Sequence, residues 1–224
     1  MKLGVLFSGG KDSYLALQYA SEEHEISCLL TLDSKRKDSW MFHTPTIEWT
    51  KLQAQSMKIE HLIQSTSGIK EEELLDLRAI IELAKSKYSI EGIVTGALAS
   101  VYQSTRIQSV CNDLHLLCFN PLWQMPQNSL LQELLSNNVE AIISGVAAEP
   151  FDDSWLGKNI DSECISNLIN LEKSNRINPA GEGGEIESFV INAPLFSKKV
   201  EISKSKKHYS NYSGRLEIME AVLR

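Results

Sequence analysis

Near the start of the chain, residues 3–17 read LGVLFSGGKDSYLAL. The apolar run Leu3–Phe7 is short and ends at a glycine loop, a pattern that predicts a buried strand. A helix is expected directly afterwards, over Ser13–Glu22. The loop between them, Ser8–Ser13, suits a phosphate group because glycines let backbone amides approach closely and a helix start offers unpaired amides. The sequence therefore predicts a phosphate-binding loop between a first strand and a first helix.

The side chains of this loop add to what its backbone offers. Ser8 and Ser13 can donate hydroxyl hydrogen bonds, and Lys11 adds a point charge. The pattern is neither GxxxxGK[ST] nor GxGxxG. The alternative is a plain glycine turn in which Asp12 or Ser13 caps the helix, but the strand–loop–helix context favours phosphate binding. The predicted nucleotide-binding residues here are Ser8, Gly9, Gly10, Lys11, Asp12 and Ser13.

Strands and helices alternate through the first half of the chain. Further strands are expected at Ile26–Leu32, Ile59–Ile63, Glu91–Thr95 and Leu116–Phe119. Further helices are expected at Ile47–Met57, Glu71–Tyr88 and Tyr102–Leu114. This alternation predicts an α/β fold with a parallel five-stranded, doubly wound sheet. If strands one and four are neighbours, the loop beginning Gly96-Ala97 meets the phosphate loop at the carboxyl ends of the strands.

The character of the sequence changes after Pro121. Helices are expected at Ser129–Leu135 and Asp161–Leu171, and strands at Ala141–Val146, Ser188–Ile191, Val200–Ile202 and Leu216–Val222. This mixture predicts a smaller C-terminal α+β domain. We place the two domains at residues 1–120 and 121–224.

Composition narrows the classes of function. The 224 residues carry a formal net charge of −7, which argues against a nucleic-acid partner because such proteins usually present a basic surface. None of the four cysteines forms a CxxC pair, and this usage suits a reducing cytoplasm. No apolar run reaches the length of a membrane span. A cytoplasmic protein with no membrane association is expected, and a homodimer is left open.

A second unusual segment is Pro179–Glu187, which reads PAGEGGEIE. It interleaves three glycines with Glu182, Glu185 and Glu187. Carboxylates on a flexible loop can hold a magnesium–phosphate complex or meet a cationic substrate. The alternative is a solvated turn.

The loop Ser8–Ser13 resembles the SGGxDS loop of the N-type ATP pyrophosphatases. That resemblance implies an adenine nucleotide α-hydrolase fold with strand order 3-2-1-4-5. It also implies chemistry in which ATP adenylates an oxygen of the acceptor, pyrophosphate leaves, and a nucleophile displaces AMP.

Taken with further stretches, the chain resembles the diphthine–ammonia ligase family over nearly its whole length. Those stretches are Met41–Pro45, Gly96-Ala97, Tyr102-Gln103 with Arg106, Pro121–Trp123, Ser154–Gly157 and Gly181–Glu187. Members amidate the carboxylate of diphthine, a modified histidine on translation elongation factor two, with ATP and ammonium. Departures from the family pattern occur at Ser104, Gln124–Pro126, Lys158 and Ile186, near the inferred substrate side.

The resemblance implies roles for individual residues near the nucleotide. Lys11, Asp12 and Arg106 are the expected catalytic residues, with Asp12 as a ligand of Mg²⁺ or, alternatively, a helix cap. Arg106 would pair a phosphate or the substrate carboxylate, and its alternative is a surface charge. Tyr102 and Gln103 would close the site or simply begin a helix.

Diphthine carries a trimethylammonium group, so an aromatic wall is expected for it. Trp123 and Trp155 are the candidates, assisted by Glu182 or Glu185, with core packing as the alternative. His43 would touch the adenine or assist proton transfer, or else be structural. Two rival functions remain: an enzyme of the same fold with another acceptor, such as tRNA or a cofactor precursor, and an ATP-binding module without turnover.

Overall fold

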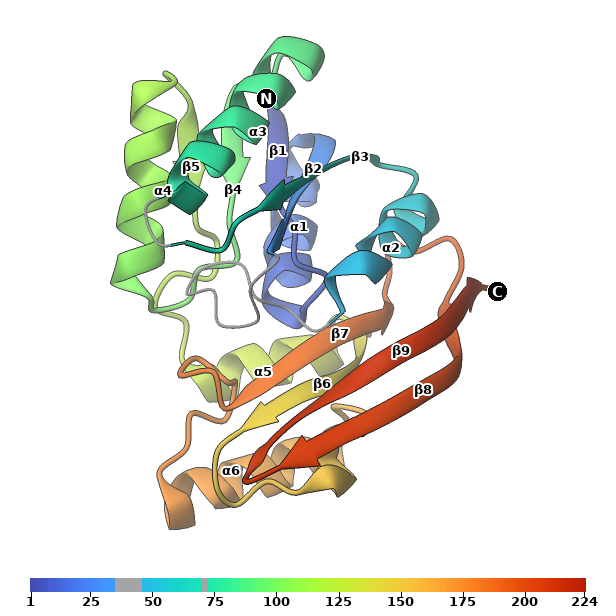
Figure 1. Cartoon of the computed structure of the whole chain (residues 1–224). Helices are drawn as coiled ribbons and strands as arrows, with labels where there is room; N and C mark the ends of the chain where they lie inside the picture. Colours follow the sequence, from blue (N-terminus) through green and yellow to red (C-terminus); the bar gives the residue numbers. More distant parts are fainter. Residues whose placement is uncertain (35–45, 70–71) are drawn as a thin grey trace.

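The computed structural model describes residues 1–34, 46–69 and 72–224. Its first sheet has five parallel strands in the order β3-β2-β1-β4-β5 (Figure 1). The strands are β1 Lys2–Leu6, β2 Glu25–Ser34, β3 Glu60–Thr66, β4 Gly92–Val94 and β5 Leu117–Phe119. The α/β class, the five strands and the order 3-2-1-4-5 expected from the sequence are confirmed.

Helices cover both faces of this sheet. They are α1 Lys11–Glu23, α2 Thr50–Met57 with the preceding 3₁₀ turn η1 Ile47–Trp49, α3 Glu72–Tyr88, and α4 Val101–Asp113. Apolar residues of α3 and α4 pack on one face of β2 and β4, whereas α1 and α2 pack on the other. On α3 the residues Leu77, Ile81 and Ala84, spaced at three and four, are buried against the sheet.

The second half of the chain forms a four-stranded antiparallel sheet in the order β7-β6-β9-β8. Its strands are β6 Glu140–Ala147, β7 Ile186–Asn192, β8 Val200–Ser210 and β9 Ser213–Leu223. Its helices are α5 Gln127–Ser136 and α6 Ser162–Asn175, and η2 Asp153–Trp155 is a single 3₁₀ turn. The expected α+β character is confirmed.

The hairpin of β8 and β9 is much longer than the sequence predicted. The expectation of a strand only at Val200–Ile202 was wrong, because the polar residues that follow lack an apolar alternation. The strands pair instead through a turn at Asn211-Tyr212, where both residues have positive φ, 50° and 59°. Two such residues form the tight turn that matches the twist of a hairpin.

One helix connects the two halves of the molecule. Apolar residues of α1 belong to a core that extends from β1 through α5 to β6 and α6. Tyr14 is fully buried; its hydroxyl accepts a hydrogen bond from Leu195 N–H at 3.2 Å, and its ring meets Phe196 edge-on. The halves therefore share one core, and the boundary after residue 120 stays a prediction.

All four cysteines lie in the described part of the chain, and none forms a disulfide. Cys28 and Cys111 are fully buried and free. No helix in the described part of the chain is both long enough and apolar enough to cross a bilayer.

Candidate functional site

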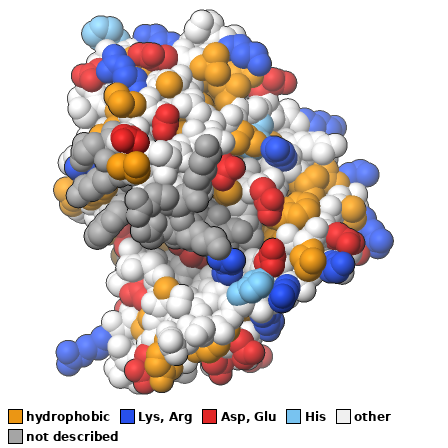
Figure 2. Space-filling view, in the orientation of Figure 1, with side chains coloured by type: hydrophobic (Ala, Val, Ile, Leu, Met, Phe, Trp, Pro, Cys, Tyr) orange, Lys and Arg blue, Asp and Glu red, His pale blue; other side chains and the backbone are white. Residues whose placement is uncertain are grey.

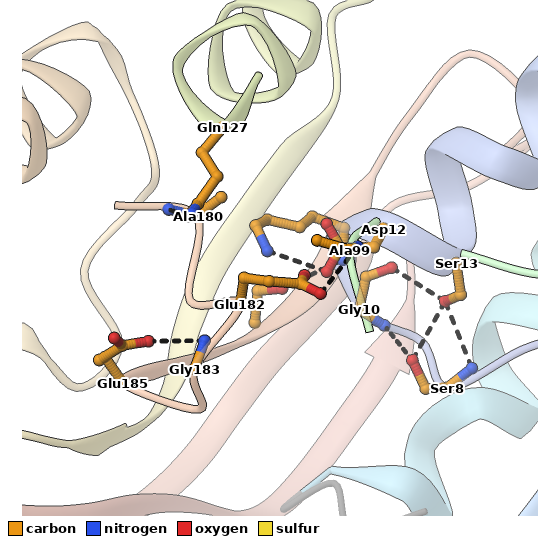
Figure 3. A network of polar contacts seen from close by, with 12 residues as sticks. Ser8, Gly10, Asp12, Ser13, Ala99, Gln127, Ala180, Glu182, Gly183 and Glu185 are labelled. Carbon is orange, nitrogen blue, oxygen red and sulfur yellow. Dashed lines mark hydrogen bonds and ion pairs between the residues drawn. The ribbon is translucent and has the colours of Figure 1, made fainter. Parts of the chain in front are cut away.

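The phosphate loop is held in shape by its own hydroxyl groups (Figure 3). Ser13 Oγ donates to Gly10 O at 3.0 Å and lies 3.2 Å from Ser8 Oγ. The backbone N–H of Ser8 donates back to Ser13 Oγ at 3.3 Å. The two serines thus tie the end of β1 to the first turn of α1.

Glycine at position 9 is required by its surroundings. Gly9 has φ +80°, and a Cβ there would lie 2.5 Å from Gln53 Oε1. Its carbonyl accepts from Val190 N–H at 2.9 Å and from Gln53 Nε2 at 3.0 Å. The loop is therefore held by hydrogen bonds from α2 on one side and from β7 on the other.

The start of α1 presents backbone N–H groups toward the carboxyl end of the sheet. The helix begins at Lys11, and its N-cap Gly10 provides no side-chain cap, so Asp12 is not the cap that the sequence allowed as an alternative. Lys11 N–H donates to Ser188 Oγ at 3.1 Å. Within the described residues the N–H groups of Asp12 and Ser13 have no acceptor. Such groups bind anions, helped by the helix dipole.

The side chains of Lys11 and Asp12 form an ion pair at 2.9 Å. Lys11 is only 3% exposed, whereas Asp12 is 35% exposed. The other carboxylate oxygen of Asp12, Oδ1, is buried without a hydrogen-bond partner. An unsatisfied buried carboxylate oxygen beside a phosphate site fits Mg²⁺, which is commonly held by one or two carboxylates together with substrate phosphates. The described residues contain no group of three or more His, Cys, Asp or Glu residues able to hold a metal alone.

The loop after β4 meets the phosphate loop, as expected if strands one and four are neighbours. A Cβ on Gly96 would lie 2.7 Å from Ser13 N and from the carbonyl carbon of Asp12. Only glycine fits this close approach of two backbones. Thr95 fixes the turn, since its Oγ1 accepts from Ala97 N–H at 3.1 Å and donates to Asn120 Oδ1 at 2.6 Å.

A cavity of about 230 Å³ opens beside this junction. Its apolar wall comprises Leu6, Phe7, Leu30, Leu32, Ile47 and Ile107. Its polar side comprises Ser8, Asp12, Ser13, Thr95, Gln103 and Glu187, with Gly96 and Ala97 between. An apolar slot that ends at a phosphate-binding helix start suits the adenosine of a nucleotide.

The acidic glycine loop is ordered by one of its own carboxylates. Glu185 accepts from Asn178 N–H at 3.0 Å, from Asn178 Nδ2 at 2.6 Å and from Gly183 N–H at 2.9 Å. Gly181 and Gly184 have φ +78° and +85°, which glycine adopts without strain. Glu185 therefore shapes the loop, and its tip at Gly183-Gly184 is an exposed turn, as the alternative considered from the sequence expects.

Glu182 links this loop to the nucleotide side. Its Oε1 accepts from Ala99 N–H at 2.9 Å, just after Gly96 and Ala97 (Figure 3). Burial raises the pKa of Glu182, and the negative charge of Asp12 acts in the same direction.

Glu187 lies at the boundary between two cavities. It lines the nucleotide cavity and also a groove of about 810 Å³ along β6, β8 and β9. Burial raises its pKa to about 7; the charge of Lys11 opposes this shift and that of Asp12 adds to it. A carboxylate in this position can meet a group that enters from the groove and approaches the nucleotide.

Other predicted residues are not among the described lining of these cavities. Arg106 stacks on the ring of Tyr102 at 3.6 Å, one turn along α4, and neither is among the described residues lining the nucleotide cavity. Trp155 packs edge-on against Phe151 with Lys158 Nζ 5.4 Å from its ring centre, so core packing describes it. Trp123 is partly buried and lines neither cavity as described.

His43 falls outside the described residues, so its predicted contact with the adenine stays a prediction. Gln103 does line the cavity from the first turn of α4, where its N–H also donates to the cap residue Ser100. Gln103 thus lies in the first turn of the helix, as its alternative expected, and its predicted role in closing the site stays a prediction.

Sequence reasoning missed three residues that position the site. Gln53 is fully buried on α2, and its Nε2 donates to carbonyls of both Gly9 and Val190. Ser188 is a buried polar residue of β7, and Thr95 is a buried polar residue directly after β4. A polar residue within an apolar run was the available signal, although it does not say which partner the residue meets.

Comparison with known proteins identifies the relatives of this chain. Residues 1–117 match the diphthamide synthase N-terminal domain, and residues 126–223 match the diphthamide synthase C-terminal domain. Diphthine–ammonia ligases of Bos taurus and Homo sapiens are each 35% identical over 92% of this chain and 84% of their own length. That of Saccharomyces cerevisiae is 31% identical over 88% of this chain but only 33% of its length.

One solved structure, titled a predicted subunit of tRNA methyltransferase from Methanocaldococcus jannaschii, covers 87% of this chain and 98% of its own. Its TM-score of 0.46 and 18% identity are too low to bear on fold or function. The two domain matches and the curated relatives lead to a single assignment. This chain belongs to the diphthamide synthase family, which is the family of the diphthine–ammonia ligases.

Proposed function

We propose that this protein amidates the carboxylate of diphthine on translation elongation factor two, using ATP and ammonia. The carboxylate oxygen attacks the α-phosphorus of ATP, so that an acyl-adenylate forms and pyrophosphate leaves. Ammonia then attacks the acyl carbon, a C–N bond forms, AMP leaves and the nitrogen releases a proton. The observation that carries the proposal is a phosphate loop with two acceptor-free amides, in a chain 35% identical to named ligases.

The first helix serves the leaving pyrophosphate. The N–H groups of Asp12 and Ser13, together with the helix dipole, offer fixed positive charge where negative charge develops. The ammonium of Lys11 adds to it from the buried side. Since adenylyl transfer depends mostly on positioning and charge neutralisation, this arrangement supplies what the step needs.

Asp12 is the proposed ligand of Mg²⁺, through the carboxylate oxygen that has no partner. When bound, Mg²⁺ neutralises phosphate charge and draws electrons from the phosphorus. Arg106 remains a proposed contact for phosphate or substrate carboxylate, with Tyr102 stacked beneath its guanidinium.

The acceptor is proposed to approach from the side of the acidic loop. Glu182 and Glu187 face the nucleotide residues Lys11 and Asp12, and both stand between the two halves of the chain. Their negative charge suits the trimethylammonium group of diphthine. Glu185 contributes indirectly, by holding the loop, and Trp123 and Trp155 remain untested as an aromatic wall.

A reconstituted reaction tests the proposal. Purified protein is incubated with ATP, Mg²⁺, ammonium and elongation factor two in its unamidated form, and the nucleotides and the mass of the factor are measured. One AMP per amide formed is expected. ATP left intact would favour a binding module without turnover, and AMP formation with tRNA or a cofactor precursor but not with the factor would favour another acceptor.

A cytoplasmic location follows from this proposed substrate and from four free cysteines. Assembly into a homodimer is a separate proposal, and light scattering of the purified protein decides it.

A further inference from the structure

The groove beside the nucleotide cavity contains an ordered row of residues across four strands. Glu187 of β7 pairs in register with Gly145 of β6, Gly145 pairs with Arg215 of β9, and Arg215 pairs with His208 of β8. All four residues line the groove. Residues directly opposite one another in an antiparallel sheet project to the same face.

The residue between the two charges has no side chain. Gly145 separates Glu187 from Arg215 by two inter-strand spacings, roughly 10 Å between Cα atoms. The register of β6 shifts between Ile143 and Gly145, leaving Ser144 buried with an unpartnered hydroxyl. Such bulges recur beside active sites, where they redirect neighbouring side chains. The row thus provides the Glu187 carboxylate and the Arg215 guanidinium on either side of Gly145, which has no side chain.

Most polar groups of the groove are already engaged. His208 Nε2 lies 2.6 Å from the Glu217 carboxylate, Lys207 Nζ donates to Asp153 O, and Tyr209 donates to Phe151 O. By contrast, across the described ranges the side chain of Arg215 makes no hydrogen bond or ion pair, although it lies in the field of Glu217.

The same holds for Glu187, the acidic residue of the row. No donor to the Glu187 carboxylate exists in the part of the chain that the structure describes, and the charged groups that face it are Lys11 and Asp12 of α1. Figure 2 shows basic and acidic side chains intermixed over β8 and β9. On this hairpin Lys204 pairs with Glu220 and His208 pairs with Glu217. The groove therefore has Glu187 at the end that meets the nucleotide cavity and Arg215 on the other side of Gly145.

We propose that Arg215 binds the reacting carboxylate of the acceptor while Glu187 faces its cationic group, so that the groove takes a zwitterionic side chain. A planar guanidinium matches a carboxylate through two parallel hydrogen bonds, and an unpaired carboxylate attracts a quaternary ammonium. Because Gly145 has no side chain, the groove between Glu187 and Arg215 has space for a group that carries both charges. Because Glu187 also lines the nucleotide cavity, a group bound in this row lies beside that cavity.

This assignment rests on the proposed function and predicts discrimination between substrate and product. The product carries an amide in place of the carboxylate, so it cannot accept two charge-assisted hydrogen bonds from Arg215. Wild-type protein should bind diphthine-bearing elongation factor two on the order of tenfold more tightly than the diphthamide form. The Arg215→Met variant should bind both forms with nearly equal affinity, and Arg215→Lys should retain part of the preference.

The test is titration calorimetry of the two forms of the factor without ATP. Lys206→Met, which removes an exposed cation from the same hairpin, is the matched control and should behave as wild type. Titration with ATP checks each variant's fold, and an Arg215→Met protein that loses ATP affinity would contradict a role confined to the acceptor.

Three results would overturn the assignment in different ways. Unchanged discrimination in Arg215→Met and Arg215→Lys removes Arg215 from the site and leaves the proposed function standing. Equal weakening for both forms means that Arg215 pairs with another acidic group of the factor. Binding of neither form by wild type overturns the proposed function together with this inference.

Discussion

Ser188 Oγ accepts a hydrogen bond from the backbone N–H of Lys11 at 3.1 Å, although 177 residues separate the two in the chain. The contact joins β7 of the second sheet to the first residue of the phosphate-binding helix. The two halves of the protein thus build the proposed nucleotide site together.

Removing this acceptor should destabilise the loop. Ser188→Ala leaves a buried N–H without a partner, which costs about 1–3 kcal/mol. We expect a lower free energy of unfolding in urea by that amount and weaker binding of ATP. Ser205→Ala, at an exposed position on β8, is the matched control. Equal stability of the two variants would mean that water satisfies the Lys11 amide.

Gly96→Ala should affect nucleotide binding more than stability. The added Cβ would lie 2.7 Å from backbone atoms of Asp12 and Ser13, and a backbone cannot yield as a side chain can. ATP affinity is expected to fall on the order of tenfold, or about 1.4 kcal/mol. As a control, Gly157→Ala introduces strain at φ +80°, about 1–2 kcal/mol, with only ordinary contacts. If both variants bind ATP as wild type does, the loop after β4 does not bound the phosphate site.

The Glu187 carboxylate should make stability depend on pH. Its pKa is raised from 4.5 to about 7, so the folded state holds a proton that the unfolded state releases. The stability associated with the protonated form is complete below pH 4.5 and is lost as the pH rises to about 7. Glu187→Gln mimics the protonated form, so it should be more stable than wild type at pH 8, by about 1–3 kcal/mol.

This gain should be much smaller at pH 4.5. Urea unfolding of both proteins in the absence of nucleotide, at pH 4.5 and pH 8, measures the difference. A gain of the same size at the two pH values would show that Glu187 ionises normally in the folded protein.

Glu185→Gln should weaken acceptor binding while ATP binding persists. The amide oxygen can keep the two hydrogen bonds from Asn178, but the amide nitrogen cannot accept the one from Gly183 N–H, so the acidic loop shifts and Glu182 with it. We expect a several-fold higher KM for elongation factor two and an unchanged KM for ATP. A higher KM for ATP alone would place Glu185 on the nucleotide side instead.

The sequence was sufficient for most of the fold because its signals are local. The glycine loop between Leu3–Phe7 and Ser13–Glu22, together with the alternation of apolar runs and helical stripes, predicts the parallel sheet that the structure contains. The hairpin of β8 and β9 could not be predicted at full length. After Ile202, β8 is held by backbone pairing along exposed, mostly polar residues, which leaves no apolar periodicity to detect there.

The site was predictable only in part, for a related reason. The loop Ser8–Ser13 carries its chemistry within six consecutive residues, so its sequence indicates its role. The roles of Gln53, Ser188 and Arg215 arise from contacts between distant segments. Glu187 was expected to meet substrate, but its place between two cavities depends on the pairing of β6 with β7.

The most direct test is a crystal structure with Mg²⁺ and an ATP analogue whose α–β bridging oxygen is replaced by a methylene group. The account predicts that the β- and γ-phosphates accept hydrogen bonds from the N–H groups of Asp12 and Ser13, with the adenine beside Leu30 and Ile107. A triphosphate bound away from the start of α1 would contradict it.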